Sequence, residues 1–404
     1  MARTPGRWPT PDPGLPTLSP VLTERPDALT ITASSATVTT TRPRPRLWDL
    51  AAFPLAVWVL WRAAQAVLVV AFGGNVVDAT FRYDGTWFRS VLEDGYVVTD
   101  RSFATQQNPA FMPGVAWLAW PVAQVIGAEA AAVVVANLTG LAAFFGVHGA
   151  TRSWASERTA RIATVALALW PTSFVLCAYY SEGLFIAATA VGLWADRRDR
   201  PAPALLACFL APLTRTVGIA FAPVLAGARW WRLGRLDAVG AGYLVSGAAA
   251  TVAVSVVQGV QAGDPLAWMH AQQAWGRGLS PPWWPVAAAL AEVVEALPLI
   301  ATEYALNLIA VAVAYAGAVV VVRWWRQGTM PTSAAAWTVA AIVLPLCTVM
   351  ISSQIRFVMA AWPAAAAFAY RGRGAGVLRL CAGAVGIALS VLLVRRWAND
   401  IWVA

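Results

Sequence analysis

Long apolar blocks dominate the sequence from about residue 47 onward, and they constrain the fold more than any other feature. A block of roughly 20 apolar residues is long enough to cross a bilayer as a helix. Hydrophobic residues make up 59% of the chain and charged residues 12%, which is about half the charged share of a soluble domain. We therefore expect an all-α polytopic membrane protein.

The positive charges indicate how the chain crosses the membrane. The formal net charge is +9, the sequence contains no lysine, and its arginines lie mostly in short links between apolar blocks. This is the positive-inside pattern of membrane proteins, so the charge is not interpreted as a nucleic-acid surface. With Arg42, Arg44 and Arg46 on the cytoplasmic side, the trace predicts about eleven spans and an exoplasmic C-terminus.

The residues before the first apolar block differ in composition from the rest. Residues 1–45 are rich in Pro, Thr and Ser and end in a basic stretch. We expect a disordered cytoplasmic tail there, followed by a single multi-span membrane domain over 46–404.

An apolar block at residues 109–127 is interrupted by Pro109, Pro113 and Pro121. If this block spanned the membrane, the basic link "TRSWASERTAR" would fall outside, against the charge rule. We therefore expect a re-entrant or interfacial helix pair at 109–127, because broken helices are tolerated where they line a cavity.

The stretch "FRYDGTWFRSVLEDGY" (81–96) lies in the first predicted outer loop. Asp84 stands among aromatic residues there, where partial desolvation would make its carboxylate a better general base. The alternative is a capping role, with Asp84 starting a short interfacial helix. The two interpretations are compatible.

Three more charged residues fall at the outer ends of predicted spans. They are Glu182 in "YYSEGLF", Arg215 in "LTRTVG" and Arg356 in "SSQIRF". Ionisable residues at membrane depth are costly and therefore indicate function. Alternatively, Glu182 caps a helix, Tyr180 belongs to an interfacial aromatic belt, and Arg215 pairs with Glu182 or reaches the headgroups.

The outer segment "PLAWMHAQQAWGR" supplies His270, Gln273 and Trp275. A tryptophan there could stack on a sugar ring or mark the membrane interface. The four Cys and two His show no metal-ligand spacing, and no phosphate-binding glycine loop is present, so no cofactor is expected. The sequence leaves a divalent cation open.

Taken in order, these motifs resemble the PIG-V family of mannosyltransferases, within the GT-C membrane glycosyltransferases. The resemblance covers about residues 48 to 370, with Tyr83 in place of the usual Trp and Met112 breaking a Phe-rich segment. The matching residues are Tyr83-Asp84, Trp87-Phe88, Gly95-Tyr96, Pro109 to Pro113, Tyr180-Ser181-Glu182, Phe185, Thr214-Arg215, Gly218, Gln273 to Arg277, Arg356 and Pro363.

The resemblance implies a GT-C fold of about 10–13 transmembrane helices, with a catalytic first outer loop that carries interfacial helices. It implies an inverting transfer of mannose from polyprenyl-phosphate-mannose to a lipid, lipoglycan or protein acceptor at the outer face of the cell membrane. Asp84 would be the general base, and Arg215 and Arg356 would bind the carrier phosphate. Glu182 would orient Arg215 or bind sugar hydroxyls. The remaining candidates for substrate binding are Tyr96, Tyr180, His270, Gln273 and Trp275.

Three other functions compete with this interpretation. A transporter or lipid flippase would also have many spans and buried charges, but we find no internal repeat. Another GT-C enzyme could transfer arabinose or glucose from a similar carrier. A membrane scaffold without catalytic activity is disfavoured by the charged residues at membrane depth.

Overall fold

The computed structural model describes residues 47–295, 298–369 and 374–402. The tail predicted for residues 1–45 lies outside these ranges. The α-helices are α1 (Leu47–Ala71), α2 (Val76–Thr80), α3 (Asp84–Asp94), α4 (Gly114–Ile126), α5 (Ala128–Trp154), α6 (Glu157–Ala168), α7 (Glu182–Arg197), α8 (Pro201–Thr214), α9 (Phe221–Leu233), α10 (Ala238–Gln261), α11 (Ala267–His270), α12 (Trp284–Glu295), α13 (Pro298–Arg326), α14 (Thr332–Val343), α15 (Gln354–Phe357) and α16 (Ala375–Ala398). Short 3-10 segments connect several of them: η1 (Asn108–Ala110), η2 (Ser173–Cys177), η3 (Thr216–Ala220), η4 (Ala271–Trp275), η5 (Leu344–Leu346) and η6 (Val358–Ala369).

The helices have the lengths and composition of a multi-pass membrane protein. Among the described residues, five helices are long and apolar enough to cross a bilayer, at Ala51–Ala71, Ala128–Trp154, Ala238–Gln261, Glu303–Arg326 and Ala375–Ala398. Four shorter apolar helices accompany them, at Gly114–Ile126, Pro201–Thr214, Trp284–Val294 and Thr332–Leu346. The predicted all-α membrane fold class is confirmed, whereas the orientation in the membrane remains a prediction.

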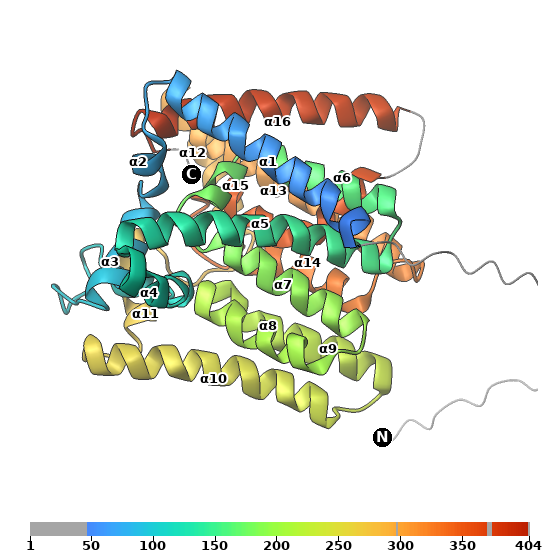
Figure 1. Cartoon of the computed structure of the whole chain (residues 1–404), viewed down its shortest axis with the longest axis horizontal. Coiled ribbons are helices and arrows are strands. Elements are labelled where there is room, and N and C mark those ends of the chain that lie inside the picture. The colour runs from blue at the N-terminus through green and yellow to red at the C-terminus, as the bar shows by residue number, and fades with distance from the viewer. Residues whose placement is uncertain (1–46, 296–297, 370–373, 403–404) are drawn as a thin grey trace, which may run out of the picture. The chain divides into compact units, whose positions relative to one another are not determined.

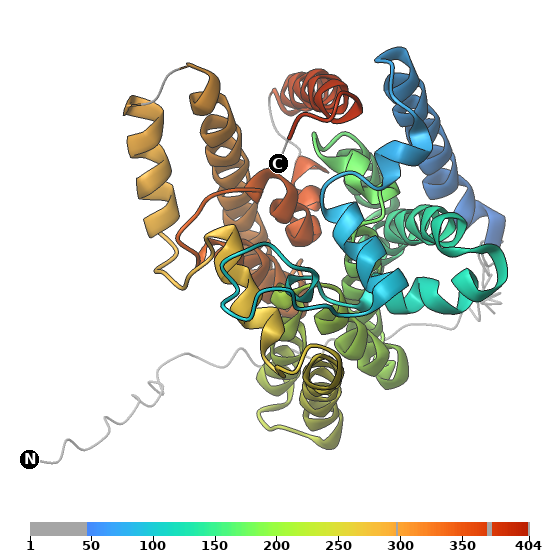
Figure 2. The ribbon, with the colours of Figure 1, turned by 90° about the vertical axis from the view of Figure 1, so that its left-hand side faces the viewer.

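The short helices of the first loop and the short helix α11 gather at one end of the bundle. Figure 1 shows α2, α3, α4 and α11 together at the left, and Figure 2 views the molecule from that end. Helix α1 ends and α5 begins at this same end, so the loop between them returns without a full crossing. Residues 109–127 accordingly form the 3-10 turn η1 and the 13-residue helix α4.

Two predicted segments differ from the structure. The trace of about eleven spans takes residues 160–178 as one of them. The helix there ends at Ala168, because Pro171 lacks the N–H that would continue it, and η2 follows. The outer segment predicted between the spans at 237–260 and 302–322 runs through Trp284 and Pro285, but these two residues instead begin the helix α12 (Trp284–Glu295).

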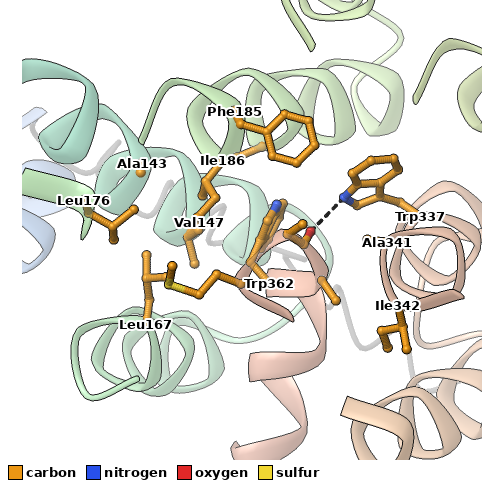
Figure 3. Close-up of a cluster of buried hydrophobic side chains, with 14 of the residues drawn as sticks. Ala143, Val147, Leu167, Leu176, Phe185, Ile186, Trp337, Ala341, Ile342 and Trp362 are labelled. Atoms are coloured by element: carbon orange, nitrogen blue, oxygen red, sulfur yellow. Dashed lines mark hydrogen bonds between the residues drawn. The ribbon is translucent and has the colours of Figure 1, made fainter. Parts of the chain in front are cut away.

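Aromatic side chains fill the centre of the bundle. Trp337 of α14 and Trp362 of η6 lie among aliphatic side chains of α5, α6 and α7 (Figure 3). The Trp337 indole donates a hydrogen bond to the carbonyl of Ala360 at 3.1 Å, and Trp362 donates one to the Thr189 hydroxyl at 3.2 Å. The indole N–H groups of these two residues are therefore satisfied, as buried donors usually are.

Glycines allow α5 to approach both η2 and the start of α7 closely. A Cβ on Gly140 of α5 would lie 2.2 Å from the carbonyl oxygen of Leu176, and one on Gly183 of α7 would lie 2.9 Å from the Gly140 nitrogen. Such distances leave no room for a methyl group. This contact fixes the start of α7, where Glu182 stands.

We expect Gly140→Ala to destabilise the protein by about 1–3 kcal/mol, because the added methyl group overpacks a rigid backbone contact. Gly149→Ala on the same helix is the matched control, since a Cβ at that position would have no neighbouring atom within 4 Å. Thermal unfolding of both variants in detergent checks this. Equal melting temperatures would contradict the packing account.

Candidate functional site

Asp84 and Arg356 each follow a residue with strained backbone. Tyr83, directly before α3, has φ of 52°, and Ser353, directly before α15, has φ of 63°. Positive φ is uncommon for residues other than glycine and is maintained only where the surrounding structure enforces it. These turns place Asp84 as the first residue of α3 and Arg356 within the four-residue helix α15.

Glu182 and Arg215 also stand where helices are interrupted. Glu182 is the first residue of α7, and Arg215 lies in extended backbone between α8 and η3. The turn after Arg215 packs so closely that a Cβ on Gly218 would lie 2.1 Å from the Ala211 carbonyl oxygen. Only glycine fits at this position.

The four charged side chains meet in one network. Arg356 Nη2 lies 2.7 Å from Asp84 Oδ2, and Arg356 Nε lies 3.0 Å from Glu182 Oε1. Arg215 Nη1 forms an ion pair with the same Glu182 oxygen. The structure therefore brings together four residues that the sequence placed on one side of the membrane.

The four side chains differ in how far they are exposed, and this difference distinguishes the roles of the two carboxylates. Glu182 and Arg356 are 5% and 6% exposed, Arg215 is 14% exposed, and Asp84 is 16% exposed. Asp84 is therefore the more accessible of the two carboxylates. Asp84 can therefore contact an incoming substrate, whereas the buried Glu182 holds Arg215 and Arg356 in place through ion pairs.

Tyr180 contacts two members of the network, Asp84 and Arg356. Its hydroxyl accepts a hydrogen bond from the Asp84 backbone N–H at 3.1 Å and donates one to the Arg82 carbonyl at 3.0 Å. The Arg356 guanidinium lies 5.2 Å from the centre of the Tyr180 ring. Tyr180 thus connects the segment just before α7 to the start of α3, in addition to the interfacial belt role that the sequence also allowed.

A third arginine, which the sequence pattern did not mark as a site residue, joins the network. The guanidinium carbons of Arg215, Arg277 and Arg356 lie 4.7, 5.1 and 5.3 Å from the centre of the Phe357 ring. Cations are attracted to an aromatic face at such distances. The sequence could have indicated Arg277, because it lies in the "QQAWGR" segment from which we selected only Gln273 and Trp275 as site residues.

Three aromatic rings from segments that carry Asp84 and Arg277 pack together. Trp275 lies 6.0 Å from Trp87 and 5.4 Å from Phe111, measured between ring centres, and Trp87 stacks against Phe111 at 6.0 Å. Trp87 is one helical turn after Asp84, and Trp275 is two residues before Arg277. Flat apolar faces next to polar groups are suited to binding a sugar ring.

The other predicted substrate-binding residues lie outside this network. The Tyr96 hydroxyl is buried and donates to the Phe111 carbonyl at 2.9 Å, which supports the aromatic rings indirectly. His270 Nδ1 lies 2.6 Å from Asp264 Oδ2, and the His270 ring packs against Phe103. Gln273 is exposed, while the neighbouring Gln272 donates to the Ala110 carbonyl at 2.8 Å.

No group of three or more His, Cys, Asp or Glu side chains suited to a metal ion occurs among the residues that the structure describes.

Solved structures with the same fold are GT-C glycosyltransferases. The apo crystal structure of the Archaeoglobus fulgidus oligosaccharyltransferase matches with a TM-score of 0.51 and 13% identity, over 86% of this chain and 56% of that one. The structure of ArnT from Cupriavidus metallidurans bound to undecaprenyl phosphate matches with a TM-score of 0.52 and 20% identity, over 82% and 63% of the two chains. The predicted GT-C fold is confirmed, although the chain spans less than two thirds of either neighbour.

No protein-family model matches the sequence, and a comparison with curated proteins finds no match. The resemblance to PIG-V mannosyltransferases therefore remains a prediction.

We expect Glu182→Gln to destabilise the protein by roughly 3 kcal/mol, because a buried cation loses its carboxylate partner. Arg215 would keep no such partner among the described residues, and Arg356 would keep only Asp84. Glu129→Gln is the matched control, since Glu129 is 57% exposed and 3.7 Å from Arg89. It should change stability by less than about 1 kcal/mol. A Glu182→Gln variant with the melting temperature of the wild type would show that this carboxylate does not stabilise the network.

Proposed function

We propose that this chain is a membrane glycosyltransferase that takes mannose from polyprenyl-phosphate-mannose. The acceptor is the hydroxyl group of a lipid, lipoglycan or protein, and the reaction occurs at the outer face of the cell membrane. The observation that carries this proposal is the meeting of Asp84 with Arg356, Glu182 and Arg215 in one ion-pair network.

The network supplies the groups that such a transfer requires. An acceptor oxygen attacks the anomeric carbon and loses its proton to the Asp84 carboxylate, while the bond from that carbon to the phosphate oxygen breaks. The sugar passes through an oxocarbenium-like transition state. Polyprenyl phosphate departs with the bonding electron pair, so charge is conserved, and attack from the opposite face inverts the anomeric centre.

In this proposal the arginines stabilise the leaving group, which is the polyprenyl phosphate. Negative charge grows on the phosphate as the bond breaks, and preformed guanidinium groups stabilise such charge without reorganisation. Arg215 and Arg356 present planar forks of donors beside Phe357, which suit phosphate oxygens. Because each is also paired with a carboxylate, its position is fixed before substrate binds.

The fold neighbours support a lipid-linked donor in general terms. One is an oligosaccharyltransferase, and the structure of the other, ArnT, contains bound undecaprenyl phosphate. The choice of mannose depends on the resemblance of the motifs around Asp84, Glu182 and Arg215 to the PIG-V family.

We expect Asp84→Asn to lower the transfer rate by about 10²–10⁴-fold, the usual contribution of a general base, because an amide cannot accept the proton. The measurement is the transfer of radiolabel from polyprenyl-phosphate-mannose to lipid or protein in membranes that contain the full chain. Asp78→Asn, in α2 of the same loop and exposed, is the control and should retain activity. An Asp84 variant with wild-type turnover would remove Asp84 as the base. Label that crosses vesicles without forming a product would indicate transport instead.

A further inference from the structure

Arg277 is held in a defined place by the segment that leads to α15. Gly278 accepts a backbone hydrogen bond from Val349 at 3.1 Å, and Leu279 forms an isolated antiparallel bridge with Thr348. Gly276 has φ of 63° and approaches so closely that a Cβ there would lie 2.6 Å from the Met350 sulfur. The loop after α11 is therefore pinned next to Arg356 and Phe357.

The positive and negative charges of the network are not equal in number. Asp84 and Glu182 are the partners of Arg356 and Arg215. Arg277 has no carboxylate at ion-pair distance within the part of the chain that the structure describes, and its Nη1 lies 3.5 Å from Gln272 Oε1, at the limit of a hydrogen bond. Three guanidinium groups and two carboxylates leave one positive charge uncompensated.

Arg277 stays charged in this setting. Burial and the neighbouring charges of Arg356 and Arg215 lower the pKa of Arg277 to about 10, although Asp84 opposes the shift. The side chain therefore remains protonated at neutral pH. Removing a cation from water without a partner is unfavourable, so the arrangement favours an anion that is part of the substrate.

We propose that Arg277 is the main anion-binding residue for the phosphate of the donor, in a subsite that it forms with Arg215 and Arg356 around Phe357. This inference rests on the proposed function and names the residue that supplies its unbalanced charge. A sugar linked to a lipid through one phosphate is a phosphodiester with a single negative charge, which equals the surplus on the network. When the sugar leaves, the phosphate gains further negative charge next to three guanidinium groups.

The test measures binding of undecaprenyl phosphate, and of undecaprenol as the neutral control lipid, to the full chain in nanodiscs. We expect Arg277→Gln to weaken binding of undecaprenyl phosphate by about tenfold or more, since a charged hydrogen bond is lost. Undecaprenol binding should not change. Arg277→Lys should keep most of the phosphate affinity because it keeps the charge. Arg101→Gln, an exposed arginine of the loop between α1 and α5, should leave binding of both lipids unchanged.

A second measurement uses the wild-type chain and does not depend on whether a variant folds. Phenylglyoxal modifies accessible arginines, and mass spectrometry locates the modified sites. Undecaprenyl phosphate should protect Arg277 and leave Arg101 reactive, whereas undecaprenol should protect neither.

Equal phosphate affinity in wild type and Arg277→Gln, or no protection of Arg277, would overturn the assignment and leave the proposed function standing. Wild-type protein that binds the phosphate lipid no better than the alcohol would overturn both. Loss of phosphate binding in Arg277→Gln supports the assignment whichever sugar is transferred.

Discussion

The ion-pair network of Asp84, Arg356, Glu182 and Arg215 is the interaction on which the rest of the structure depends. A charge inside an apolar bundle is costly unless it is paired. Glu182 is bonded to two arginines, and Arg356 is bonded to two carboxylates. Removal of Glu182 therefore leaves Arg215 without its partner, and removal of Arg356 leaves Asp84 without its partner. Segments far apart in the sequence, α3, α7, α8 and α15, must therefore meet at one place.

Interrupted helices make this meeting possible. Every member of the network stands at the start of a helix or beside a break, where the backbone can turn and direct a side chain inward. In a membrane protein, irregular backbone is stable only where it is buried in protein or lines a cavity. The strained residues Tyr83 and Ser353 and the packed glycine Gly218 are the local cost of this arrangement. That strain beside charged residues is typical of sites that bind or react.

The sequence predicted those properties that depend on local composition. Hydropathy predicted the membrane class. The basic link "TRSWASERTAR" predicted, by the charge rule, that residues 109–127 do not cross, which the positions of α1 and α5 match. The pairing of Arg215 with Glu182 was one of two alternatives for Arg215, and the structure contains it.

Contacts between distant segments were not predictable in the same way. Nothing local indicates that Arg356 reaches Asp84, because that contact requires the whole bundle. The register of η4 decides that Gln272 rather than Gln273 contacts the loop after α3. In the sequence Arg277 does not differ from other loop arginines, and only the fold shows that it lies beside Phe357. The helix α12 was missed because the prolines and tryptophans of residues 281–285, just before and at its start, are typical of a loop.

The most direct measurement of the central claim is an experimental structure of the full chain with a non-hydrolysable polyprenyl-phosphate-mannose analogue. The account predicts phosphate oxygens within about 3 Å of the guanidinium groups around Phe357, and the anomeric carbon facing the Asp84 carboxylate. A phosphate bound at another surface of the bundle, with Asp84 still closed against Arg356 and no sugar beside it, would contradict the account.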